Sequence, residues 1–120
     1  MSIEEFIKSE LQSVDDLRAL LLFHLNPEPT RDAEETASRL YIPPAAAAMV
    51  LARLAERGFL TGAGEPPRYR FQPRDPELAA LIQELAELDR KKPVTLLKMI
   101  YSRPKDIQAF ADAFKLKKET

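Results

Sequence analysis

The sequence contains no cysteine, and only one of its 120 residues is a histidine. The absence of cysteine excludes disulfide bonds, thiolate metal sites and cysteine nucleophiles, and it fits a reducing cytoplasm best. The single histidine, His24, forms neither a metal site nor a catalytic triad, because no supporting residues stand at a recognisable spacing. A phosphate-binding loop is missing as well. The sequence therefore predicts neither an enzyme nor a cofactor-binding protein.

Long apolar stretches are also missing. The run from Ala19 to Leu25 is interrupted by His24 and falls far short of the roughly 20 residues that a membrane-spanning helix needs. No basic leader with a small-residue cleavage site stands at the start, so we expect a cytoplasmic protein without a membrane partner. The composition, 45% hydrophobic and 31% charged, is typical of one ordinary globular core.

Charge is unevenly distributed, although the net charge is only −1. Residues 1–35 hold 3 basic and 9 acidic residues, a net charge of −6. Residues 36–74 hold 6 basic and 2 acidic residues, a net charge of +4, and residues 75–120 hold 9 and 8, a net charge of +1. Because a phosphate backbone responds to local charge, the middle segment mildly favours a polyanionic partner.

Apolar residues recur at helical spacing near the start of the chain. They predict a short amphipathic helix that ends near Gln12 and a second helix from the capping residue Ser13 to Leu25. The main apolar stripe of the second helix continues to Leu25, whereas Leu22 and Phe23 point off it. We therefore expect this helix to be buried on more than one side, with a second subunit as one hypothesis for the additional cover.

The next segment predicts two helices joined by a tight turn. A helix of about two turns begins at a cap provided by Thr30 or Asp32. Pro43 or Pro44 suits the first position of a longer helix, because proline lacks the N–H that is unpaired there in any case. Gly58 then closes the longer helix, since glycine adopts positive φ without strain.

A β-hairpin follows between Phe59 and Pro73, with its loop at 61–67. In the returning strand, Arg68 and Arg70 alternate with aromatic residues and so occupy the opposite face. Three further segments are expected to be helical: one from Pro76 to the break at Lys91, one over 94–101, and a last one from Pro104.

This order of elements is that of a winged helix-turn-helix, in which the longer helix enters the major groove of DNA. Leu54, Arg57 and Gly58 at the end of that helix, together with segments 35–44 and 68–71, resemble the corresponding parts of MarR-like bacterial transcriptional regulators. The resemblance implies a mainly α fold with a small β-hairpin wing, and additional N- and C-terminal helices.

The same resemblance implies a dimeric DNA-binding transcriptional regulator. It divides the chain into an N-terminal amphipathic helix (1–12), a winged helix-turn-helix domain (13–74) and C-terminal helices that form a dimerisation region (75–120). Regulators of this type pair through their terminal helices. The expected partners are therefore double-stranded DNA and a second copy of the chain.

By analogy with those regulators, six residues face the DNA groove: Pro43, Pro44, Ala45, Ala46, Met49 and Arg53. Only the arginine offers a polar side chain, and alanine or methionine touches a thymine methyl group without making bidentate contacts to bases. Three further arginines are expected to follow the phosphates: Arg39, Arg68 and Arg70. We therefore expect weak or non-specific reading of DNA sequence.

Several of these residues have a second interpretation. The strand arginines would point to solvent whatever their role, because buried aromatic residues alternate with them. The flat apolar patch of Ala45, Ala46, Ala48 and Met49 fits a protein partner, a helix that touches DNA methyl groups, or simply a high helix propensity. The alternative function is therefore a non-enzymatic protein-protein interaction module on a winged-helix scaffold.

Acidic residues gather before and within the first helix of the helix-turn-helix. Glu28, Asp32, Glu34 and Glu35 resemble the carboxylate pairs of acid/base enzymes in composition. They occupy a loop and a helix start, where acidic residues favour the positive pole of the helix. We expect them to be solvated and to cap the helix rather than to catalyse a reaction.

Overall fold

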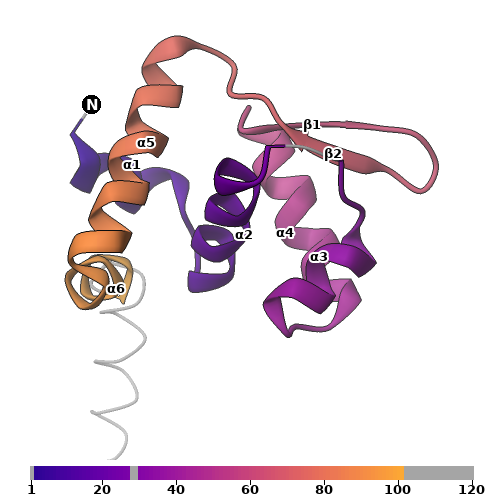
Figure 1. Ribbon diagram of the computed structural model, residues 1–120, viewed down its shortest axis with the longest axis horizontal. Helices are drawn as coiled ribbons and strands as arrows, with labels where there is room; N and C mark the ends of the chain where they lie inside the picture. The colour runs from indigo at the N-terminus through magenta and orange to yellow at the C-terminus, as the bar shows by residue number, and fades with distance from the viewer. Residues whose placement is uncertain (1, 28–29, 102–120) are drawn as a thin grey trace, which may run out of the picture.

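The computed structural model describes residues 2–27 and 30–101 (Figure 1). These residues form six α-helices and a two-stranded antiparallel sheet. The elements are α1 (Ile3–Glu10), α2 (Val14–Leu25), α3 (Ala33–Leu40), α4 (Pro44–Glu56), β1 (Leu60–Ala63), β2 (Arg68–Phe71), α5 (Pro76–Lys91) and α6 (Pro93–Tyr101). The expected mainly helical, winged helix-turn-helix fold is confirmed, and the helix predicted from Pro104 lies outside the described residues.

The helices begin where local side chains cap them. The Ser13 hydroxyl accepts a hydrogen bond of 3.2 Å from the Asp16 N–H at the start of α2. Asp32, one of the two predicted caps for α3, forms a capping box with Glu35. The Asp32 carboxylate accepts a hydrogen bond from the Glu35 N–H, and the Glu35 carboxylate accepts one from the Asp32 N–H. Pro44 occupies the first turn of α4. These local signals set the helix boundaries.

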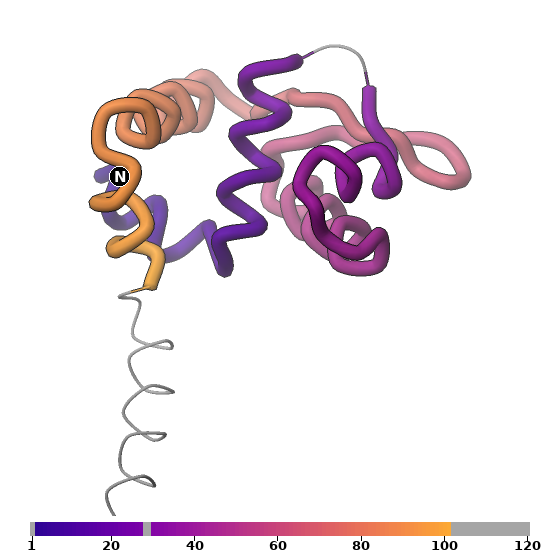
Figure 2. The backbone as a smooth tube through the Cα atoms, turned by 60° about the horizontal axis from the view of Figure 1, so that its bottom comes forward, coloured from indigo at the N-terminus to yellow at the C-terminus, as the bar shows by residue number. Residues whose placement is uncertain are grey.

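Helix α2 lies at the centre of the molecule, with α3 and α4 on one side and α5 on the other (Figures 1 and 2). Phe23, which was expected to point off the main apolar stripe, is fully buried, whereas Leu25 is 67% exposed. The burial of Phe23 agrees with the expectation that α2 is buried on more than one side, because the chain's own elements pack around it from several directions, whereas the exposure of Leu25 was not expected. The second apolar face of α2 therefore needs no second subunit to cover it.

Helices α1, α5 and α6 contact one another and form what we call the terminal-helix lobe (Figure 1). Phe6 and Ile7 of α1 are buried there together with Leu96 of α6. The same hydrophobic cluster continues through α2 to Leu51 and Leu54 of α4, so one core joins the lobe to the winged helix. Among the described helices, none combines the length and the apolar character that a membrane crossing requires.

The first strand of the hairpin is longer, and the loop shorter, than the sequence indicates, because β1 continues to Ala63, which pairs with Arg68. Arg31 adds a bridge on the other side of β2. Its N–H donates to the Tyr69 carbonyl at 2.9 Å and its carbonyl accepts from the Tyr69 N–H at 2.8 Å. The wing is therefore attached to the segment that leads into α3.

Candidate nucleic-acid interface

The outer face of α4 is apolar. Between residues 41 and 52 the exposed side chains include no charged group. Met49 is 66% exposed and Ala46 is half-buried, while the buried side of the helix supplies core residues. The exposed residues of the turn and helix are Tyr41, Pro43, Pro44, Ala45, Ala48, Met49 and Ala52. Except for the half-buried Ala46, the apolar residues predicted to face a groove therefore lie at the surface.

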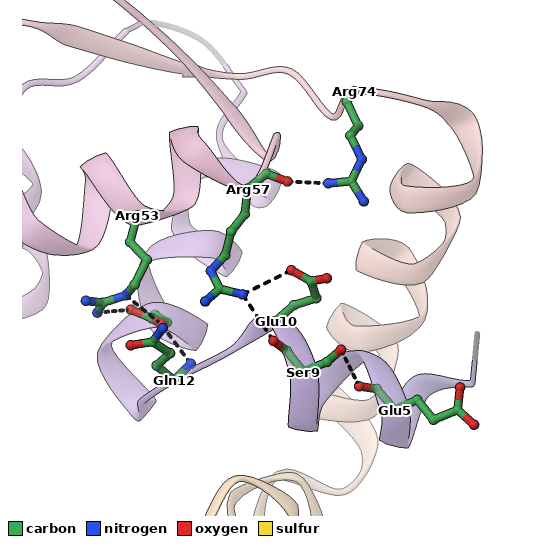
Figure 3. A network of polar contacts seen from close by, with 8 residues as sticks. Glu5, Ser9, Glu10, Gln12, Arg53, Arg57 and Arg74 are labelled. Carbon is green, nitrogen blue, oxygen red and sulfur yellow. Dashed lines mark hydrogen bonds and ion pairs between the residues drawn. The ribbon is translucent and has the colours of Figure 1, made fainter.

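Arg53 points back into the protein, toward the start of α2 (Figure 3). Its Nη2 lies 2.6 Å from Oδ1 of Asp16, and its Nε donates to Oδ2 at 3.2 Å. The Asp16 carboxylate is fully buried and also accepts from the Gln12 N–H at 2.8 Å. A two-point guanidinium-carboxylate contact is among the stronger and more directional hydrogen-bonded pairs. The one polar side chain expected to read bases is thus engaged within the chain.

Arg68 of the wing is also engaged by neighbouring residues. Its Nε donates to Thr30 Oγ1 at 3.0 Å and its Nη2 to the Thr30 carbonyl at 2.8 Å. Its Nη1 lies 2.7 Å from Glu35 Oε1 and 3.5 Å from Asp32 Oδ2. Arg68 therefore joins β2 to the capping box of α3, and the acidic residues that were expected to cap the helix also neutralise a wing arginine.

Arg39 and Arg70 are less constrained. Arg39 is exposed on α3, and its side chain has no hydrogen bond or ion pair with another residue in the described part of the chain. Arg70 is exposed on β2 and donates to Gln72 Oε1 over 3.3 and 3.4 Å, which are long hydrogen bonds. Four arginines were predicted to contact DNA. Within residues 2–27 and 30–101, Arg53 and Arg68 form ion pairs with carboxylates, whereas Arg39 and Arg70 do not.

Solved structures match nearly the whole chain. A MarR family protein from Bacillus stearothermophilus is 16% identical, with a TM-score of 0.54, and the match covers 98% of this chain and 81% of that one. The chain has a MarR-like winged-helix fold. No protein-family model matches the sequence. No curated protein matches it either.

Two regulators share this MarR-like fold. BpsR from Bordetella bronchiseptica, whose DNA binding is regulated by 6-hydroxynicotinic acid, is 13% identical with a TM-score of 0.55, over 97% of this chain and 82% of BpsR. The PcaV transcriptional regulator from Streptomyces coelicolor, solved with its natural ligand, is 16% identical with a TM-score of 0.53, over 98% of this chain and 82% of PcaV. At such identities the similarity establishes the fold alone.

Two residues that the sequence pattern did not single out lie at the turn of the MarR-like helix-turn-helix. Tyr41, 90% exposed, follows α3 with a φ of 58°. Positive φ is strained for a tyrosine, and strain that persists at an exposed turn is a reason to suspect function. Arg18 of α2 donates to the Leu40 carbonyl at 2.9 Å and covers the end of α3. The signal for Tyr41 was a large residue at a helix end where glycine or asparagine is usual.

A polar network fastens the end of α4 to the terminal-helix lobe (Figure 3). Arg57 donates to the Ser9 carbonyl at 3.1 Å and pairs with Glu10 of α1 at 3.2 Å. Arg74, in the segment before α5, donates to the Arg57 carbonyl. Gly58 has a φ of 86°, and a Cβ there would lie 2.8 Å from Cδ of Arg74. Arg57 and Gly58, which belong to the sequence pattern that resembles MarR-like regulators, thus lie where the winged helix joins the rest of the molecule.

His24 of α2 packs against the wing. Its ring packs edge-on against Phe71 of the wing, with centroids 5.3 Å apart. Its Nδ1 is buried and has no hydrogen bond within the part of the chain that the structure describes. Nor do the histidine, aspartate and glutamate side chains of residues 2–27 and 30–101 gather in a group of three that could hold a metal ion.

Proposed function

We propose that this chain is a DNA-binding transcriptional regulator that reads DNA sequence weakly. One observation carries the proposal: the chain has the MarR-like arrangement of α3, α4 and a projecting hairpin, most of which falls within the positively charged segment 36–74 (Figure 1). In this proposal α4 enters the major groove and presents Pro44, Ala45, Ala46 and Met49 to the bases. Such residues contact thymine methyl groups but supply no donors or acceptors, so discrimination between sequences is small.

The phosphate contacts are assigned first to Arg39 and Arg70, because their charges are not paired with a carboxylate. Arg53 and Arg68 reach phosphates only after leaving the partners described above. Binding therefore rests on few cations, which supports a modest affinity with a shallow logarithmic salt dependence. Regulators with this fold are generally non-enzymatic, and we propose that this chain likewise acts only by binding, in the cytoplasm.

Fluorescence anisotropy with a short labelled duplex at low salt tests the proposal. We expect saturable binding that weakens as salt rises. Arg39→Ala and Arg70→Ala should each weaken binding and flatten the logarithmic salt dependence by about 0.9 for the lost phosphate contact. Lys8→Ala, which removes the same charge from an exposed position on α1, should leave both quantities unchanged. Failure of the unmodified chain to bind any duplex at low salt would contradict the proposal.

We also propose that the chain is a homodimer joined through its terminal-helix lobe. In α6, Val94 and Tyr101 are 63% and 64% exposed and Leu97 is 37% exposed. Large apolar side chains gathered on one short helix favour contact with another protein surface. A paired molecule would also place two α4 helices on one duplex, as dimeric helix-turn-helix proteins do.

The apolar face of α4 favours a second candidate function, a protein-protein interaction module. Tyr41 and Met49 are both exposed large residues, and no charge interrupts the surface between them. The two functions differ in which substitutions should weaken binding to the partner. Met49→Glu should abolish binding to a protein partner while Arg39→Ala preserves it; a DNA-binding surface requires Arg39 and Arg70.

A further inference from the structure

We propose that Glu35, assisted by Asp32, masks a phosphate-binding position on the wing, so that these carboxylates set how tightly the chain holds DNA. The inference rests on the proposed function. It assigns a role in affinity to two acidic residues whose capping of α3 alone does not require contact with Arg68.

The Arg68 guanidinium is held in two separate ways. Thr30 accepts hydrogen bonds from Nε and Nη2, at 3.0 and 2.8 Å, and so fixes the plane of the guanidinium. Nη1 is left to the carboxylates, with Glu35 the nearer at 2.7 Å and Asp32 at 3.5 Å. If the carboxylates withdraw, Thr30 still orients the guanidinium and Nη1 becomes free. An arginine oriented in advance by neutral groups loses little freedom when it binds an oxyanion.

The pair is also exposed enough to exchange partners. The side chains of Arg68 and Glu35 are 45% and 49% exposed, so water and salt screen their attraction. A phosphate oxygen offers the same chemistry as a carboxylate oxygen to the guanidinium. Phosphate and Glu35 therefore compete for Nη1 on similar terms.

An open groove lies next to this pair, with Glu35 in its wall. Its volume is about 610 Å³, and Arg31, Glu34, Ser38 and Arg39 complete the lining. Arg39 follows Glu35 by four residues on α3, which places both on one face of the helix. A phosphate in the groove thus meets Arg39 and, on the same helix face, Glu35, whose carboxylate contacts Arg68. Repulsion by Glu35 is what keeps such a phosphate weakly bound.

Glu35→Gln tests the inference, with Glu34→Gln as its matched control. Both changes remove one negative charge from the first turn of α3 and from the same groove, but only Glu35 contacts Arg68. Glutamine still completes the capping box, so α3 keeps its start. Asp32→Asn, which keeps the helix cap, is a second independent variant.

We expect Glu35→Gln to bind a labelled duplex about three- to tenfold more tightly than Glu34→Gln at about 50 mM salt, with a logarithmic salt dependence steeper by about 0.9. Asp32→Asn should show a smaller gain, in keeping with its longer distance from Arg68. Adding Arg68→Ala to Glu35→Gln should remove the gain, while Arg68→Ala alone should change affinity less than about twofold. Equal binding by the two glutamine variants, or an equal effect of Arg68→Ala in both backgrounds, would overturn the inference.

A titration with inorganic phosphate separates this inference from the proposed function. The Arg68 Nε–H signal in the NMR spectrum should shift saturably in Glu35→Gln and hardly at all in Glu34→Gln. If no variant binds DNA but this difference is seen, the masked anion site stands and the DNA-binding function falls. If the chain binds DNA but both variants respond equally to phosphate, the inference alone is wrong.

Discussion

At the scale of single residues, the roles of Arg53 and Arg68 depend on the carboxylates beside them. Both arginines lie in segments where a winged helix meets DNA, yet one is paired with a buried aspartate and the other with an exposed glutamate. A buried partner cannot be given up without leaving an uncompensated charge, whereas an exposed one can. Arg53 is therefore chiefly structural, and Arg68 is available for exchange.

Arg53→Ala should lower the free energy of unfolding by about 2 to 4 kcal/mol, because Asp16 remains buried without its partner. Urea unfolding followed by circular dichroism measures the change. Arg39→Ala, which removes the same charge from an exposed position, should cost less than about 0.5 kcal/mol. An Arg53→Ala protein that is as stable as the unmodified chain but no longer binds DNA would place Arg53 in the groove instead.

Local chemistry explains which residue roles the sequence could predict. Ser13 and Asp32 cap helices by contacts that reach only three residues along the chain, so their neighbours reveal them. The pair between Asp16 and Arg53 spans 37 residues, and the pair between Thr30 and Arg68 spans 38. Such pairings depend on how α2, α3, α4 and the wing pack, which no local pattern specifies. The exposure of most of the apolar residues on α4 was predictable, but the engagement of Arg53 and Arg68 within the chain was not.

At the scale of elements, the end of α4 depends on Gly58. Its positive φ lets the chain turn into β1, and Arg74 packs closely over it. Gly58→Ala should therefore lower the free energy of unfolding by about 2 kcal/mol or more, from backbone strain and from displacement of Arg74. Gly64→Ala is the control, since Gly64 has a φ of 94° but a Cβ there would make only an ordinary van der Waals contact, 3.5 Å from the Pro66 carbonyl oxygen. It should cost only the strain, about 1 kcal/mol. Thermal unfolding compares the two, and equal losses would contradict the role given to Arg74.

The turn between α3 and α4 carries strain of the same kind. Tyr41 holds a φ of 58° while its side chain lies in solvent. Tyr41→Asn should raise the free energy of unfolding by about 0.5 to 1 kcal/mol, because asparagine tolerates this backbone region better. If Tyr41 is kept for contact with DNA or a partner protein, the same variant should bind that partner more weakly. A stability loss in thermal unfolding would show that the tyrosine side chain contributes more than its strain costs.

Element boundaries were more predictable than the faces of elements. Helix caps, prolines and glycines mark the ends of α2, α3 and α4, and the structure has these helices close to where they were expected. The inward side of α2 was harder to predict because the helix is surrounded. When apolar residues point in several directions, periodicity cannot tell which of them lie in the core, and Leu25 was placed on the main apolar stripe although it is exposed.

At the scale of the whole molecule, the winged helix and the terminal-helix lobe share one core and are fastened by Arg57. If the lobe forms the dimer, this connection also fixes the spacing of the two α4 helices. Leu97→Glu should convert the dimer to a monomer, since it places a charge on the exposed face of α6. Light scattering gives the mass and circular dichroism checks that the helices remain. An unmodified chain that is monomeric at high concentration would refute the dimer.

Binding of the unmodified chain to two unrelated duplexes of equal length tests the central claim most directly. Anisotropy titrations at about 50 mM and about 200 mM salt give both affinity and salt dependence. A winged helix with two arginines free of carboxylate partners, Arg39 and Arg70, and an apolar α4 face should bind both duplexes, with affinities within about tenfold of each other and a clear loss at the higher salt. No saturable binding at the lower salt, or a preference of about a thousandfold typical of sequence-specific regulators, would contradict the claim.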